Sequence, residues 1–250
     1  MNQLTNKKIL ILGLGMIGGS LARALKAFDQ KLVIYAVDSN EEAIKLALEE
    51  KKIDKAGTLE SLVPLSDIII LAVPPLSIEK ILPALAKHLK PNAIVSDVAS
   101  VKGHLLEPLK KFDDEFVKRF VPGHPIAGSE KSGYAASVAE LFKGRNVILT
   151  PLKQNSPWAV NTIHALWRCT GANVLGMAVE KHDEVLAATS HLPHLLAYAI
   201  VDALAGQKQS EDIFRYAAGG FADFSRLASS DETMWSDIFI ANSRAIEQVL

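Results

Sequence analysis

The sequence is poor in cysteine and has no excess of charge of either sign. Cys169 is the only cysteine among 250 residues, so no internal disulfide can form, and a reducing compartment fits that usage. The 27 Lys and Arg residues nearly balance the 28 Asp and Glu residues, and no basic tract is present. The composition therefore gives no electrostatic reason to expect nucleic acid or a membrane surface as a partner.

Long hydrophobic runs and an N-terminal leader are also missing. The apolar stretch at residues 68–76 contains two prolines and is far too short to span a bilayer. Residues 1–8 are polar and lead straight into a predicted strand, which is not the pattern of a signal peptide. We therefore expect a soluble, cytoplasmic protein.

Short apolar runs alternate with amphipathic segments through the first two thirds of the chain. The apolar runs predict strands at residues 8–12, 32–37, 68–73, 93–96, 117–121 and 146–149, with a last edge strand at 173–175. The amphipathic segments predict helices at residues 18–28, 40–50 and 78–88, the second with Asn40 as its N-cap. Repeated βα units of this size predict a parallel sheet with helices on both faces.

The strand pattern stops near residue 179. Residues 180–204 predict one long helix that is interrupted by Pro193, and residues 210–250 also have a helical pattern. We therefore expect two domains, a parallel α/β domain at residues 1–178 and an all-α domain at residues 179–250.

A glycine-rich loop, Gly13-Leu14-Gly15-Met16-Ile17-Gly18, separates the first predicted strand from the first predicted helix. Gly13 permits a tight turn, Gly15 lets the backbone approach a pyrophosphate, and Gly18 lets the helix pack close to the sheet. The alternative is a bare glycine turn. The strand before the loop and the helix after it favour a doubly wound Rossmann domain that binds a dinucleotide.

Asp38 indicates which dinucleotide binds. It lies about 20 residues past the loop, at the end of the second predicted strand, where a carboxylate bonds the ribose 2′-hydroxyl of NAD and repels the 2′-phosphate of NADP. No arginine is adjacent, so NAD is favoured over NADP. Val73, Pro74 and Ser100 follow two further strands and are expected to face the same crevice, unless these are ordinary βα loops.

His124 is the first candidate for chemistry. It lies in the glycine-rich run at residues 123–130, which predicts a loop. A histidine in such a loop can project into a cleft, and its ordinary pKa suits proton transfer near neutral pH. The alternative is a solvated loop histidine.

The long predicted helix carries His182, Asp183, His191 and His194. His191 and His194 share one face, but a metal would need a third ligand at a defined position. The H-E-x-x-H pattern is absent, so we predict no metal site. The alternative to a role in binding is that these are buried or capping histidines.

The later helical region contains an unusual pair of glycines, Gly219 and Gly220, which bend a helix and allow another group to approach closely. Arg226 follows, and arginine is the residue type that clamps a carboxylate with two hydrogen bonds. The alternative is an ion pair between Asp223 and Arg226 on a helix surface.

Together these motifs closely resemble the prephenate/arogenate dehydrogenase family of tyrosine biosynthesis. The glycine loop is common to many dehydrogenases, whereas the histidine loop at residues 123–133 and the Ser-His-Leu-Pro-His run at residues 190–194 are far more specific. The resemblance spans nearly the whole chain. The other matching stretches are residues 97–102, 182–183, 218–226 and 234–235.

The resemblance implies an oxidative decarboxylation. A hydride leaves C4 of a cyclohexadienol for NAD⁺ and the ring carboxylate leaves as CO₂, which converts prephenate to 4-hydroxyphenylpyruvate. Arogenate, or both substrates in a cyclohexadienyl dehydrogenase, is the alternative, because the two differ only in a keto or amino group. The resemblance also implies that the helical domain forms a homodimer, with the active site between the domains.

The resemblance assigns roles to individual residues. His124 would draw off the proton of the C4 hydroxyl, Ser100 would orient that hydroxyl and the histidine, and Arg226 would bind a substrate carboxylate. The remaining substrate-binding residues would line the pocket or govern its access and polarity: Ser129, Glu130, His191, His194, Gly219, Asp223 and Trp235.

Two rival functions share parts of this pattern. Another NAD-linked enzyme of the β-hydroxyacid or imine-reducing kind would share the Rossmann half, but the Ser-His-Leu-Pro-His run argues against it. A dinucleotide-sensing protein without activity would bind NAD and produce no NADH. The density of candidate catalytic residues argues against that function.

Overall fold

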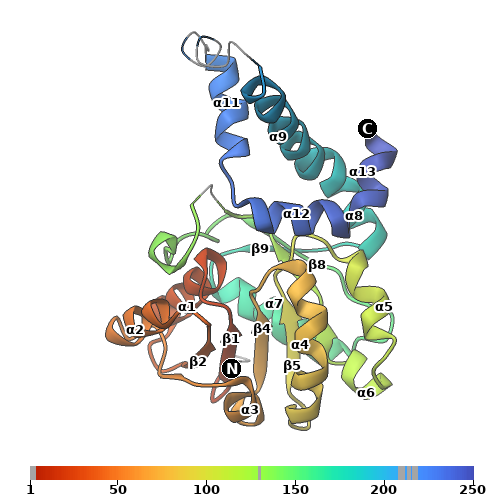
Figure 1. The fold of residues 1–250 in the computed structure, drawn as a ribbon. Helices are drawn as coiled ribbons and strands as arrows, with labels where there is room; N and C mark the ends of the chain where they lie inside the picture. Colours follow the sequence, from red (N-terminus) through yellow and green to blue (C-terminus); the bar gives the residue numbers. More distant parts are fainter. Residues whose placement is uncertain (1–3, 129–130, 208–211, 213–214, 216–218) are drawn as a thin grey trace.

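The computed structural model describes residues 4–128, 131–207, 212, 215 and 219–250. Its first part contains a six-stranded sheet in the order β3-β2-β1-β4-β5-β6, with every neighbouring pair parallel (Figure 1). The strands are β1 (Lys8–Leu12), β2 (Val33–Val37), β3 (Lys55–Ala56), β4 (Ile68–Leu71), β5 (Ile94–Asp97) and β6 (Phe120–Val121). This is the strand order of a doubly wound Rossmann sheet, so the predicted fold class is confirmed.

Helices cover both faces of this sheet because its strands are apolar on both sides. Ile9 and Ile11 of β1 belong to one buried core, whereas Leu10 and Leu12 belong to the other. Each such buried aliphatic side chain contributes roughly 1.5–3 kcal/mol to stability. The first face carries α1 (Met16–Phe28), α2 (Glu41–Glu49) and α7 (Pro157–Cys169), and the second carries α3 (Leu59–Leu62), α4 (Pro75–His88), α5 (Leu106–Leu109) and α6 (Asp114–Val117).

A second, three-stranded sheet corrects two local predictions, and a short helix corrects a third. It consists of β7 (Gly123–Pro125), β8 (Asn146–Leu149) and β9 (Asn173–Gly176), with β7 antiparallel to β8. The loop predicted at residues 123–130 is therefore wrong for its first three residues, because His124 pairs with Ile148. The last strand lies at the edge of this sheet and not of the large one. The strand predicted at residues 117–121 is also too long, since Asp113 caps a helix that ends at residue 117.

The helical part differs from its prediction in one respect. The single helix predicted at residues 180–204 is divided by a π-helical turn (Ala187–His191), in which the Leu192 N–H donates to the Ala187 carbonyl. Because Pro193 has no N–H to donate one turn back, the α-helical pattern is weakened just before it. The helices are α8 (Val179–Leu186), α9 (Leu192–Ala205), α11 (Gly219–Ala228), α12 (Glu232–Ala241) and α13 (Ser243–Val249).

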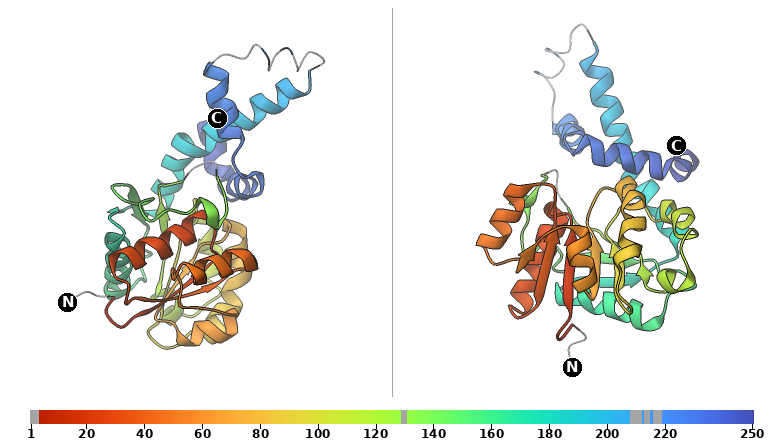
Figure 2. Two further views of the ribbon diagram at one scale, coloured as in Figure 1. Left: turned by 90° about the vertical axis from the view of Figure 1, so that its left-hand side faces the viewer. Right: turned by 60° about the horizontal axis from the view of Figure 1, so that its bottom comes forward.

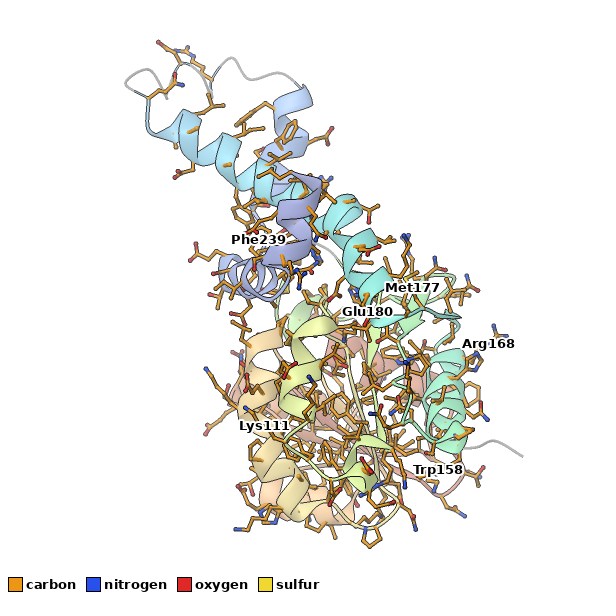
Figure 3. All side chains as sticks on the ribbon, turned by 90° about the vertical axis from the view of Figure 1, so that its right-hand side faces the viewer. Lys111, Trp158, Arg168, Met177, Glu180 and Phe239 are labelled. Carbon is orange, nitrogen blue, oxygen red and sulfur yellow. The ribbon has the colours of Figure 1, made fainter. Side chains whose placement is uncertain are left out.

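The helical part stands at the carboxyl end of the large sheet. Helix α12 lies across that end, and α9 and α11 project away from it side by side (Figures 1 and 2). On α12, the Asp237 carboxylate accepts a hydrogen bond from the Leu76 N–H at the start of α4. Figure 3 shows Met177 and Glu180 where the two parts meet, with Phe239 on the helical side. None of the described helices is long and apolar enough to cross a membrane.

Candidate active site

The glycine loop after β1 is packed so tightly that two of its positions accept only glycine. Gly13 has a φ of 96°, and a Cβ there would lie 2.3 Å from the Ala72 carbonyl oxygen. A Cβ at Gly18 would lie 1.9 Å from the Gly13 carbonyl oxygen. The loop is therefore pressed against the end of β4, where Val73 and Pro74 follow.

Gly15 has the opposite environment, and this is the observation that fits a dinucleotide. A Cβ at Gly15 would meet nothing within 4 Å, so its side of the loop is open. Gly15 is also the N-cap of α1, and it has no side chain with which to cap that helix. A bare turn would not need open space at a helix N-terminus, whereas a pyrophosphate would use both the space and the positive end of the helix dipole. Of the other loop residues, Leu14 is buried and Met16 and Ile17 are half-buried.

Asp38 is fixed beside this loop just past the end of β2. Its Oδ2 accepts a hydrogen bond from the Leu14 N–H at 2.5 Å, and its Oδ1 accepts one from the Asn40 N–H at 2.7 Å. The carboxylate is half-buried. It is thus held at the position where the sequence predicts a contact with ribose, and each oxygen retains a lone pair for a hydroxyl.

His124 begins a chain of hydrogen bonds that links the two parts of the molecule. Its Nδ1 lies 2.9 Å from the Nε2 of His182, on α8. The Nδ1 of His182 lies 2.7 Å from the Oδ1 of Asp183. That carboxylate also accepts hydrogen bonds from the N–H groups of Lys102 at 2.9 Å and Gly103 at 2.7 Å. His124 and Asp183 are almost fully buried and His182 is fully buried.

The order of partners determines where the protons lie. An ionised carboxylate only accepts hydrogen bonds, so the His182 Nδ1 must donate to Asp183. The Nε2 of neutral His182 is then an acceptor, and the Nδ1 of His124 must donate to it. The Nε2 of His124 consequently carries no proton, and no hydrogen bond joins it to the described residues. An unprotonated imidazole nitrogen of this kind can act as a general base.

The surroundings keep His124 uncharged. Burial lowers its pKa well below 6.5, and the nearby groups of His182, Lys102 and His191 act in the same direction. For Asp183, burial acts to raise the pKa of the carboxyl, but the hydrogen bonds from His182, Lys102 and Gly103 outweigh it and lower that pKa. The group at one end of the chain is therefore an anion and the group at the other end is a neutral base.

A buried ion pair holds the strand that carries His124. The Lys102 ammonium pairs with the Asp97 carboxylate at the end of β5 and donates to the Gly123 carbonyl at 2.7 Å. Asp97 also accepts hydrogen bonds from the N–H groups of Ala99 and Gly123. Ser100 lies half-buried in the same segment, and no hydrogen bond between its hydroxyl and His124 is found in the described part of the chain. Its role in orienting His124 stays a prediction.

The aromatic ring of Trp235 joins the remaining histidines. It stacks on the His194 ring, with centroids 3.7 Å apart, and meets the His191 ring edge-on at 6.2 Å. The His194 Nδ1 donates to the Ser190 carbonyl at 2.9 Å, which leaves its Nε2 as an acceptor. Burial lowers the pKa of His194, and the charge of Arg226 lowers it further. Arg226, exposed on α11, therefore lies within electrostatic reach of this cluster.

The other predicted substrate-binding residues have no described contact with the histidines of the site. Asp223 and Gly219 are exposed on α11, and within the described residues no ion pair joins Asp223 to Arg226. Ser129 and Glu130 lie outside the described residues. Among the residues that are described, no group of His, Cys, Asp and Glu side chains is arranged to hold a metal ion.

Asp97, Lys102 and Asn242 are buried in the site and were not candidates in the sequence, and His182 and Asp183 were candidates without an individual role. Asp97 and Lys102 lie in one of the matching stretches, and a carboxylate at the end of a buried strand is a signal that could have found the pair. Asn242 contacts residues 51 and 59 positions away, so no local pattern could have found it.

Comparison with known families and proteins follows the same division of the chain. The family described as "Prephenate dehydrogenase, nucleotide-binding domain" matches residues 21–176, and "Prephenate dehydrogenase, dimerization domain" matches residues 178–250. The cyclohexadienyl dehydrogenase of Zymomonas mobilis is 36% identical over 98% of this chain and 84% of its own length.

Two solved structures are similar over almost the whole chain. Prephenate dehydrogenase from A. aeolicus, in complex with hydroxyphenyl propionate and NAD⁺, has a TM-score of 0.90 and 39% identity, and covers 97% of this chain and 85% of its own. Arogenate dehydrogenase from Synechocystis has a TM-score of 0.79 and 30% identity, and covers 97% of this chain and 86% of its own.

Proposed function

Because the chain belongs to the prephenate/arogenate dehydrogenase family, we propose that it catalyses the NAD-dependent oxidative decarboxylation of prephenate to 4-hydroxyphenylpyruvate, in tyrosine biosynthesis. The observation that carries the proposal is the hydrogen-bonded chain from Asp183 through His182 to His124. It leaves an unprotonated imidazole nitrogen at the carboxyl end of the sheet, where ligands bind in doubly wound folds.

NAD is the cofactor, and its binding elements are the N-terminus of α1, the open side of Gly15 and the Asp38 carboxylate. Val73 and Pro74 follow β4 next to the same loop, and Ser100, which follows β5, completes the predicted set. Bound NAD⁺ supplies the acceptor for the hydride that leaves C4 of the substrate. Asp38 favours NAD over NADP because a second negative charge at the 2′ position would be repelled by it.

The role of His124 is to take the proton of the C4 hydroxyl. As its Nε2 accepts that proton, the ring becomes a cation whose Nδ1–H donates more strongly to His182. Asp183 in turn strengthens the His182 Nε2 as an acceptor of that hydrogen bond, because its carboxylate accepts from the other nitrogen of the His182 ring. The departure of the ring carboxylate as CO₂ makes the ring aromatic, which drives the reaction forward.

Arg226 and the His191 ring are the groups that would bind substrate carboxylates, and His194, whose Nε2 is an acceptor, would lie near the side-chain end of the substrate. Prephenate carries two carboxylates, and a dianion in a partly dry site requires a cation or several N–H donors. Arg226 is a permanent cation near His194. Trp235 fixes the His194 ring by stacking on it and contributes an apolar wall.

Arogenate is the second candidate substrate, alone or together with prephenate. The names of the similar proteins include a cyclohexadienyl dehydrogenase and an arogenate dehydrogenase as well as a prephenate dehydrogenase. The two substrates differ at the side chain only, and a few polar contacts at that end are enough to discriminate between them.

The test is to follow NADH or NADPH absorbance with prephenate and with arogenate, each with NAD⁺ and with NADP⁺. We expect turnover with NAD⁺, and kcat/KM for the two substrates decides which is preferred. We also expect His124→Asn to lose most of kcat, whereas His164→Asn, on the exposed face of α7, is the matched control. NAD⁺ binding without turnover of either substrate would favour a sensing protein. Near wild-type kcat in His124→Asn would refute the assigned base.

We further propose that the protein is a cytoplasmic homodimer. Helix α9 is almost entirely apolar, yet Ala197 is its only buried residue, and α11 has none. Two adjacent helices with so little buried surface need a partner to cover them. The free thiol of Cys169 supports a cytoplasmic location. The match of residues 178–250 to a dimerization domain supports a homodimer.

A further inference from the structure

The His191 ring contains a polar atom whose partner is missing from the described structure. Its side chain is fully buried in the π-helical turn, and its Nε2 makes no hydrogen bond to any residue that the structure describes. A buried polar atom without a partner is destabilising, and such atoms are rare unless a ligand or an ordered water completes them. The His191 Nε2 is therefore available to a group that lies outside the described residues, such as a ligand.

The contacts of Asn242 determine whether the His191 Nε2 carries a proton and is therefore a donor or an acceptor. The Asn242 side chain, at the junction of α12 and α13, lies with its Nδ2 3.0 Å from the Asp183 carbonyl oxygen and 2.9 Å from the His191 Nδ1. A carbonyl oxygen can only accept, so the amide nitrogen must face it. The second amide hydrogen then points to the His191 Nδ1, which must be an acceptor. The proton of neutral His191 is consequently on Nε2.

We propose that Asn242 is a positioning residue, which holds His191 in the tautomer with its proton on Nε2 so that His191 donates a hydrogen bond to an acceptor oxygen of the bound substrate. The proposal rests on the proposed function, because prephenate supplies carboxylate and keto oxygens that accept such a bond. His191 donates as a neutral group, since burial lowers its pKa to about 4. It thereby complements Arg226, which offers a charge.

The location supports a role in the reaction. His191 lies edge-on to Trp235, whose other neighbour is the His194 ring, and the charge state of His191 affects the pKa of His124. Asn242 also bonds the backbone of Asp183, the anion that sets the tautomers of His182 and His124. The Asn242 amide therefore contacts both His191 and the hydrogen-bonded chain that runs from Asp183 to His124.

Two substitutions separate tautomer control from packing. In Asn242→Asp the carboxylate keeps the shape but cannot donate, so His191 must place a proton on Nδ1, either as the other neutral tautomer or as a cation. In Asn242→Ala no group dictates the tautomer. If hydrogen bonding matters, we expect kcat/KM for the preferred substrate to fall about 100-fold in the Asp variant and only about tenfold in the Ala variant. A packing role predicts the reverse order, because alanine leaves the larger cavity.

The matched control is Asn155→Asp. The Asn155 amide likewise donates two hydrogen bonds, here to the backbone carbonyls of Val117 and Phe120, but it lies in the loop between β8 and α7. This variant is expected to lose stability and to retain its kcat/KM. An equal loss of kcat/KM in the control would assign the effect to destabilisation and overturn the proposal.

The direct readout is ¹⁵N NMR of histidine-labelled protein, which distinguishes the two neutral tautomers from the cation without any substrate. We expect His191, identified by the loss of its signals in His191→Gln, to be protonated on Nε2 alone at pH 7.5 and to change state in Asn242→Asp. A wild-type His191 protonated on Nδ1 overturns the inference even if no variant folds. Absence of turnover by the wild type would refute the proposed function and leave the tautomer result standing on its own.

Discussion

Asp183 lies two hydrogen bonds away from the proposed base, yet it decides which nitrogen of His124 is free. An asparagine at this position retains the shape, but its amide nitrogen is a donor. That nitrogen would face a group that now donates to Asp183, either the His182 ring or a backbone N–H. We expect Asp183→Asn to lower kcat about 10³-fold with little change in KM, since a reversed tautomer removes the base and the anion that stabilises the cation is lost. Initial rates with the preferred substrate measure both constants.

The control for this substitution is Asp113→Asn at the N-cap of α6. Its carboxylate accepts from the Phe116 N–H, which an asparagine can also do, so activity and stability should both be nearly unchanged. A kcat for Asp183→Asn within about tenfold of the wild type would contradict the tautomer argument.

The pH dependence of the reaction follows from the lowered pKa of His124. Burial first, and then the neighbouring groups of His182, Lys102 and His191, disfavour its charged form. A base with a lowered pKa stays deprotonated as the pH falls, so kcat/KM should remain flat through pH 6.5 and decline only at clearly more acidic pH. The measurement is the pH profile of kcat/KM. An acid limb of the kcat/KM profile centred at or above pH 6.5 would show that the pKa of His124 is not lowered in the free enzyme.

At the scale of elements, the π-helical turn sets the relative positions of the site's histidines. One extra residue in a helical turn rotates everything beyond it by about 100°, so His194 and the face of α9 depend on this turn. Alanine at position 193 restores the missing N–H and lets the α-helical pattern continue. We expect Pro193→Ala to lower kcat/KM about tenfold while the free energy of unfolding does not fall.

The matched control is Pro83→Ala, since Pro83 is an exposed proline inside α4, away from the site. It should leave kcat/KM unchanged. Rates in substrate assays and urea unfolding followed by circular dichroism measure the two properties. If Pro193→Ala loses stability and activity together, the turn has only a structural role.

The sequence predicts some elements better than others for a physical reason. β1 and β4 could be predicted because strands buried on both faces are continuous apolar runs that need no knowledge of their neighbours. β7 could not, since its Gly-His-Pro sequence becomes a strand only by pairing with β8, more than twenty residues later. The π-helical turn was missed in the same way, because Pro193 marks an interruption but does not specify its form.

The candidate site shows the same limit. The glycine loop and Asp38 are local signals in a repeated βα pattern, and the structure places them next to each other as that pattern requires. The partners of His124 are different. His182 is 58 positions away, and the contact depends on how the helical part sits on the sheet. The residue types indicate that these side chains are candidates, but only the fold shows that they form a chain of hydrogen bonds.

At the scale of the whole molecule, the two parts differ in how they are stabilised. The sheet and its helices enclose two extensive cores, one on each face. Among the described residues, the helical part shares one small buried cluster with the sheet part, in which Trp235 and Ile238 pack against Val101. The projecting α9 and α11 have no core of their own among the described residues, so their stability depends on what covers them (Figure 2).

A second copy of the chain is the partner that we propose, and Leu196 on α9 provides the test. Its side chain is 43% exposed, although the helix around it is apolar. A glutamate there would bury a charge in the interface, which costs several kcal/mol, so Leu196→Glu should raise the dissociation constant of the dimer more than about 100-fold. Leu65→Glu is the control, because Leu65 is 39% exposed on the Rossmann part. Sedimentation velocity over a range of concentrations should show a dimer for the wild type and the control and a monomer for Leu196→Glu. A monomeric wild type, or a dimer that Leu196→Glu leaves intact, would mean that this face of α9 is not where two copies meet.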